Sequence, residues 1–177
     1  MEKFEKDYYR LTGAADDKLW RKLLNLAIYH HIRFVFWLRR AEAGGLYARW
    51  KCYRYSRKYG LEISPKAKIA EGLYLGHPYN ITVGSGAELG KNVNLHKGCT
   101  IGADVRADRT GPPRLGNNVW CGINSVIIGK VTIGDDVLIA PGAFVNFDVP
   151  AHSIVIGNPG TIHPRDNATD GYILHAV

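Results

Sequence analysis

A six-residue repeat constrains this chain more than any other feature, and it runs from Ile63 to about Ile156. Large apolar residues recur six apart in three blocks, and smaller residues follow each of them by four positions. This period is typical of a parallel β-helix, in which three hexapeptides, each a short strand and a turn, form one coil. The large residues are Ile63, Ile69, Leu75 and Ile81; Val83, Leu89, Leu95 and Ile101; then Leu115, Cys121, Ile127, Ile133, Ile139 and Val145.

Two interruptions break the count. Two extra residues precede Val83, and a longer insertion runs from Ala103 to about Arg114. This insertion is polar and rich in turn formers, so it must leave the coil as a loop, a common place for function on a repeat scaffold. One edge of the triangular prism should carry, on successive coils, the turns that contain His77, Lys97, Ile123 and Pro141.

Residues 1–60 differ in kind from the repeat. We expect a helix that begins near Asp16 and Asp17, which would cap it, and that ends near Ala43. Gly44 and Gly45 should separate it from a second helix over residues 46–58. The chain carries a net charge of +7. Residues 1–60 alone carry +8, from 14 basic and 6 acidic residues, so the remaining residues are nearly neutral at −1. We therefore divide the chain into a basic aromatic leader (1–60), a β-helix (61–160) and a tail (161–177).

The leader suits three roles. A basic segment rich in Trp and Tyr is typical of contact with an anionic membrane surface, and nucleic acid would need the same charge. A helical cap with a solvated basic face is the simplest interpretation, and we expect no nucleic-acid partner. The run from Ile28 to Leu38 is too short to span a bilayer and is interrupted by charge. No signal peptide follows Met1, so we expect a cytoplasmic protein, with peripheral contact to the inner face of the membrane as an option.

His77 is the strongest candidate for chemistry. It lies at a turn in Gly76-His77-Pro78, with His96 one coil above it. Imidazole is the side chain best suited to take a proton from an alcohol at neutral pH. Glu62 is the nearest carboxylate that could orient it. The two histidines give at most two metal ligands and no third has suitable spacing, so we expect no metal site.

Two stretches of the repeat resemble the left-handed β-helix acyltransferases, specifically their serine acetyltransferase-like branch. They read GLEISPKAKIAEGLYLGHPYNITVGSGAELGKNVNLHKGCTIG and LGNNVWCGINSVIIGKVTIGDDVLIAPGAFVNFDVPAHSIVIGNPG. The leader FWLRRAEAGGLYARWKCYRYSRKYGLEI resembles the subgroup found among capsule and exopolysaccharide biosynthesis enzymes. The resemblance covers nearly the whole chain. It implies a left-handed coil, a homotrimer, and acetyl-CoA as cosubstrate in the groove between neighbouring prisms.

The resemblance also implies roles for single residues. His77 matches the general base and Glu62 the acidic residue that orients it, and His96 is the alternative base. The acceptor hydroxyl would lose its proton to His77 and attack the thioester directly. The turn residues expected above His77 would line the pantetheine groove: Gly102, Gly122, Ile123, Ala140 and Pro141.

Two departures from the family pattern bear on the ligands. The second active-site histidine of serine acetyltransferases falls in the inserted loop, where this chain reads Pro112-Pro113-Arg114. The closing motif GVPA, followed by Lys or Arg, is here the sequence GNPGT at residues 157–161, so we expect Arg165 to replace the usual contact to the CoA phosphates.

These features predict an acetyl-CoA-dependent O-acetyltransferase that acts on a sugar hydroxyl in polysaccharide or glycolipid assembly. Proline at position 112 cannot transfer a proton, and the loop offers polar groups to a larger acceptor: Asp104, Arg109 and Arg114. The alternative enzyme is serine O-acetyltransferase in cysteine synthesis. A non-catalytic β-helix whose leader binds a partner or a membrane is the alternative from another class.

Overall fold

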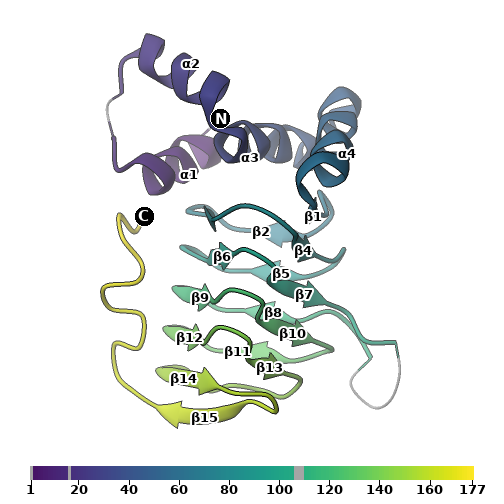
Figure 1. The fold of residues 1–177 in the computed structure, drawn as a ribbon, viewed down its shortest axis with the longest axis vertical. Helices are drawn as coiled ribbons and strands as arrows, with labels where there is room; N and C mark the ends of the chain where they lie inside the picture. Colours follow the sequence, from purple (N-terminus) through teal and green to yellow (C-terminus); the bar gives the residue numbers. More distant parts are fainter. Residues whose placement is uncertain (1, 16, 106–109) are drawn as a thin grey trace.

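The computed structural model describes residues 2–15, 17–105 and 110–177. It is a left-handed parallel β-helix of about five coils, capped at one end by four helices (Figure 1). The mainly β fold with a helical N-terminal extension confirms the fold predicted from the repeat. The helices are α1 (Glu2–Thr12), α2 (Leu19–Ile28), α3 (His30–Glu42) and α4 (Leu46–Tyr59).

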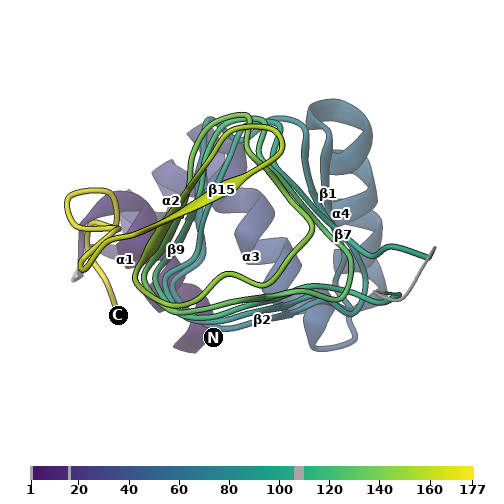
Figure 2. The ribbon, with the colours of Figure 1, turned by 90° about the horizontal axis from the view of Figure 1, so that it is seen from below.

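The strands form the three sides of a triangular prism, whose outline is clear along its axis in Figure 2. Side A contains β1 (Leu61–Ile63), β4 (Ile81–Val83), β7 (Thr100–Gly102), β10 (Val126–Ile128) and β13 (Phe144–Val145). Side B contains β2 (Lys68–Ile69), β5 (Glu88–Leu89), β8 (Arg114–Leu115) and β11 (Thr132–Ile133). Side C contains β3 (Tyr74–Gly76), β6 (Asn94–His96), β9 (Val119–Cys121), β12 (Val137–Ile139), β14 (Ser153–Ile156) and β15 (Thr161–Pro164).

The coil register follows the six-residue count. On side C, Leu95 pairs with Leu75 and with Cys121, and Cys121 pairs with Ile139. All pairs between successive coils are parallel, and β15 alone among the paired strands runs antiparallel, beside β14. The inward residues of both series are buried, including the small Cys99 and the hydroxyl-bearing Ser125. A narrow apolar prism therefore forms the core, as the spacing predicts.

Each interruption of the count lies at a corner. Val83 pairs with Ile101 and with Ile63, which places the two extra residues in the corner between sides C and A, within residues 77–80. The longer insertion leaves the corner between sides A and B. Its base is an antiparallel bridge between Asp104 and Gly111, whose two hydrogen bonds measure 3.3 and 3.0 Å.

The leader folds differently from the prediction in two places. The expected helix to Ala43 is broken at Tyr29, whose extended backbone (φ −91°, ψ 110°) separates α2 from α3. No carboxylate caps α2, because Asp17 accepts a hydrogen bond from the Tyr8 hydroxyl instead; Asp16 lies outside the described residues. The break at the two glycines and the helix that follows it are confirmed. In the described part of the chain, no helix is long and apolar enough to cross a membrane.

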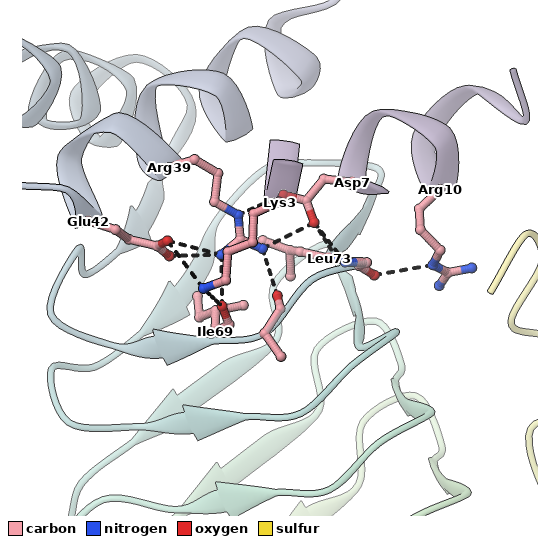
Figure 3. A network of polar contacts seen from close by, with 9 residues as sticks. Lys3, Asp7, Arg10, Arg39, Glu42, Ile69 and Leu73 are labelled. Atoms are coloured by element: carbon pink, nitrogen blue, oxygen red, sulfur yellow. Dashed lines mark hydrogen bonds and ion pairs between the residues drawn. The ribbon is translucent and has the colours of Figure 1, made fainter. Parts of the chain in front are cut away.

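A buried polar network fixes the helices to the first coil (Figure 3). The Asp7 carboxylate accepts hydrogen bonds from Arg39 at 2.6 and 3.1 Å and from the backbone N–H groups of Gly72 and Leu73 at 2.8 and 2.9 Å. Arg39 also donates to the carbonyls of Ile69 and Ala70. The first coil has no coil before it, so these side chains satisfy backbone groups that would otherwise be unpaired.

The tail returns along the outer face of side C from the last coil to α1 (Figure 1). Asp136 accepts hydrogen bonds from the backbone N–H groups of Ala168 and Thr169, at 3.0 and 2.9 Å. Asn92 exchanges two hydrogen bonds with the backbone of Val177, at 2.9 and 3.1 Å. Side C is therefore covered along its length, whereas sides A and B have no comparable cover among the described residues.

Candidate functional site

His77 lies on the two-residue bulge at the corner between sides C and A. Its backbone is left-handed (φ 48°), and the Tyr79 N–H donates to its carbonyl at 2.8 Å, so the chain makes a tight turn around Pro78. A non-glycine residue with positive φ is uncommon, which makes this turn a locally constrained one. The side chain is exposed at the corner. The geometry thus presents an imidazole to solvent on a rigid scaffold.

The turns of the next coils stack above His77 as the repeat predicts. The Lys97 N–H donates to the carbonyl of Gly76 at 3.0 Å, and the Asn124 N–H donates to the carbonyl of Lys97 at 2.9 Å. The Gly142 N–H continues this ladder to the carbonyl of Ile123 at 2.9 Å. One corner therefore carries a column of turns above the candidate base.

Glu62 is separate from His77 in the single chain. It lies on β1 of side A, is exposed, and accepts a hydrogen bond from the Ser56 hydroxyl of α4 at 3.3 Å. Among the interactions of the described residues, none joins this carboxylate to the imidazole. Its orienting role therefore stays a prediction carried by the resemblance.

His96 occupies a different environment, although it lies one coil above. Its ring packs on Gly76 and lies 4.6 Å from the Trp120 ring, centroid to centroid, on the outer face of side C. Burial lowers its pKa, and the neighbouring His77 lowers it further. Its Nε2 atom is buried with no hydrogen-bond partner in the described structure. His96 is therefore half-buried under other side chains, and His77 is the better placed base.

The helical cap adds an aromatic cluster beside the His77 bulge that the repeat could not reveal. The His30 ring stacks on Tyr59 at 4.3 Å and lies 5.1 Å from the Tyr79 ring. His30 Nε2 also lies 3.3 Å from the carbonyl oxygen of Pro78. These residues come from α3, from the end of α4 and from the bulge itself. The only signal in the sequence is the density of aromatic residues before Gly60.

Three of the six cofactor candidates line one groove of about 610 Å³ between side C and the tail: Ala140, Pro141 and Arg165. Gly122 and Ile123 lie in the corresponding turn one coil before Pro141; a side chain at Gly122 would collide with the backbone of the Pro141 turn. Gly102 does not belong here, which corrects the prediction. It pairs with Ile128 on side A and lies at the corner where the inserted loop leaves.

The substrate candidates lie at the opposite edge of side A from His77. Arg114 begins β8 on side B and forms an ion pair with Glu88 at 3.3 Å. Asp104 forms the bridge at the base of the loop. Arg109 lies outside the described residues. The described base of the loop therefore lies at another corner of the chain than His77.

Comparison with known proteins supports the fold and the resemblance to acyltransferases. The family described as "Bacterial transferase hexapeptide (six repeats)" matches residues 112–146. Serine acetyltransferase 2 of Arabidopsis thaliana is 34% identical over 109 residues, which are 62% of this chain and 34% of that protein. The serine acetyltransferase of Helicobacter pylori is 34% identical over 107 residues, 60% of this chain and 63% of that protein. The chain thus spans between about one third and two thirds of the length of these curated relatives.

Solved structures agree. Neisseria gonorrhoeae serine acetyltransferase in complex with serine superposes with a TM-score of 0.70 at 28% identity, covering 90% of this chain and 66% of that one. The soybean serine acetyltransferase apoenzyme gives a TM-score of 0.67 at 26% identity, covering 78% of this chain and 60% of that one. The chain therefore has the hexapeptide-repeat β-helix fold and is similar over most of its length to serine acetyltransferases.

Proposed function

We propose that the chain is an acetyl-CoA-dependent O-acetyltransferase that uses His77 as its general base. The observation that carries the proposal is the exposed imidazole on the two-residue bulge, below a column of turns that leads to a groove. The similarity to serine acetyltransferases supports the same reaction class. Acetyl-CoA would lie along that column, with Ala140, Pro141 and Arg165 beside it.

The reaction needs only a base and a place for the developing charge. Imidazole Nε2 or Nδ1 of His77 takes the proton from the acceptor hydroxyl as its oxygen attacks the thioester carbonyl. The carbonyl oxygen becomes an oxyanion, which a backbone N–H of a neighbouring turn would stabilise. The C–S bond then breaks, and the thiolate of CoA takes the proton that the imidazole holds. The ester and free CoA leave, and His77 is again neutral.

The relatives favour L-serine as the acceptor over the sugar hydroxyl expected from the sequence. These relatives are all serine acetyltransferases. A sugar stays the second candidate because Pro112 stands where the family has its second histidine. In this chain Pro112 packs against Gly86, and proline offers no proton to transfer.

An acceptor panel tests this choice. Purified protein is mixed with acetyl-CoA and either L-serine or a series of monosaccharides and nucleotide sugars, and release of CoA thiol is followed. We expect efficient acetylation of serine at millimolar concentration and little turnover of sugars. Turnover of a sugar with none of serine would restore the saccharide acceptor. If neither serine nor any sugar causes release of CoA thiol, the acetyltransferase proposal is contradicted.

We propose further that the active unit is a trimer. In one chain, His77 and the inserted loop lie at different corners, on opposite edges of side A. A neighbouring prism could bring its own loop beside His77 and wall the groove. Light scattering should therefore give a mass about three times the 19.7 kDa of one chain. A stable monomer at micromolar concentration that still acetylates serine would contradict this arrangement.

A further inference from the structure

The apolar side of α2 faces away from the protein. Five large apolar residues recur at helical spacing along this ten-residue helix: Leu19, Trp20, Leu23, Leu24 and Ile28. Their side chains are between 45% and 73% exposed, and no residue of α2 is buried. We call these five residues the α2 stripe. An exposed apolar stripe of this kind marks an interaction surface.

The opposite side of α2 holds the helix in place through polar contacts and through Leu26, which packs against the core. Lys22 forms an ion pair with Glu5 of α1, and the Asn25 amide donates to the Tyr8 hydroxyl at 2.7 Å. Arg33 of α3 donates to two carbonyls near the end of α2, at 3.1 and 2.8 Å. A helix that only covered a core would turn its apolar side inward, so this orientation requires another explanation.

Helix α4, which packs on α3 as α2 does, supplies positive charge. Its sequence contains five basic residues and no acidic one: Arg49, Lys51, Arg54, Arg57 and Lys58. Within the described residues, none of these five is in an ion pair with a carboxylate. Four of them instead lie over aromatic rings, as Lys51 does 5.3 Å from the Trp50 centroid. Four of the five line a groove of about 920 Å³ between α3 and α4, together with half-exposed aromatic side chains.

We propose that the helical end of the molecule docks on a membrane surface rich in anionic phospholipids. The α2 stripe enters the boundary between headgroups and acyl chains, and the lipid phosphates lie against the cations of α4. Helix α2 exposes Trp20, and α4 exposes Tyr47, Trp50 and Tyr53; both residue types suit this boundary. Both helices pack on α3 at the end remote from the last coil (Figure 1).

Charge decides between a membrane and a second copy of the chain. Residues 1–60 carry +8, so pairing two helical ends would bring like charges together, whereas an anionic bilayer complements them. A trimer with parallel prisms would present three such ends in one plane, which adds avidity on a flat surface. The docking itself does not depend on acetyl transfer, so its failure would leave the proposed reaction untouched.

Vesicle flotation tests the proposal. The full chain is mixed at low salt with vesicles of phosphatidylcholine alone or with about one third phosphatidylglycerol. We expect flotation only with the anionic vesicles, weakening as salt is added. Leu19→Gln with Leu23→Gln should reduce partitioning by about tenfold or more for each side chain removed. The matched variant Val105→Gln with Ile156→Gln, which changes exposed apolar residues of the β-helix, should float like the wild type.

A charge pair separates the two contributions. Lys51→Gln with Lys58→Gln should weaken flotation by about tenfold or more, since each lysine near an anionic surface contributes about fivefold. Lys97→Gln with Lys130→Gln removes the same charge from the β-helix and should have little effect. Three results would overturn the proposal: no flotation at low salt, an α2 variant that floats normally, or self-association through the α2 stripe without vesicle binding. The last would identify a second copy as the occupant.

Discussion

Replacing His77 by asparagine should slow acetyl transfer by about 10²–10⁴-fold, because the reaction loses its general base. Asparagine is the right replacement, since it tolerates the left-handed backbone that His77 adopts (φ 48°) and should leave the bulge intact. Turnover is measured with acetyl-CoA and L-serine. Binding of acetyl-CoA, followed by calorimetry, should be nearly unchanged because the groove beside Ala140 and Pro141 is not altered.

A matched variant tests whether the effect belongs to this histidine. His163→Asn removes an exposed imidazole from β15, at the end of the prism far from His77. It should leave turnover at the wild-type rate. Near-normal turnover of the His77→Asn protein would remove His77 from the mechanism. His96 would then be the candidate general base; its buried Nε2 has no hydrogen-bond partner among the described residues.

Removing the Asp7 carboxylate should cost about 3–5 kcal/mol of folding free energy, the typical cost of breaking a buried ion pair from one side. Asp7 is fully buried and the Arg39 side chain is 6% exposed, so Asp7→Ala would leave this buried cation with only the Glu42 carboxylate, at 2.9 Å, as its ion-pair partner. Two backbone N–H groups of the first coil would also lose their acceptor. Urea unfolding at one fixed protein concentration measures the loss, because association contributes to stability.

Two further variants sharpen this test. Glu2→Ala on the same helix removes an exposed carboxylate from a surface pair and should change stability by less than about 1 kcal/mol. Asp7→Asn removes the charge but keeps an oxygen that can accept from the backbone N–H groups of Gly72 and Leu73, so it should be less damaging than Asp7→Ala. A loss below about 1 kcal/mol for Asp7→Ala would show that the helical cap does not depend on this network.

The sequence predicted the β-helix in detail because every coil repeats the same physical requirement. An inward residue must be apolar and small enough for the prism, and six residues return the chain to the next side. That count alone gives the pairing of Leu75, Leu95, Cys121 and Ile139. The same count could also have excluded Gly102 from the column of turns above His77. Gly102 follows Ile101, a residue of side A, whereas Gly122 follows Cys121, a residue of side C.

The rest depended on contacts that have no period. The break at Tyr29 is accommodated by Arg33, which satisfies carbonyls at the end of α2, and no propensity predicts that pairing. The Asp7 network joins residues more than 30 positions apart, so spacing along the chain cannot reveal it. The aromatic cluster beside His77 likewise comes from segments that meet only after folding.

The length of the tail matches the number of coils in the β-helix. It fastens at Asp136 in the fourth coil, at Asn94 in the second, where Tyr172 accepts a hydrogen bond, and at Asn92. Successive coils lie about 4.8 Å apart, so an eighteen-residue insertion that adds one coil would move the first anchor away from the last by that distance. The final residues would then fall short of Asn92. Relatives with more coils would need a longer tail or none, and a copied repeat would be tolerated here only with a matching extension.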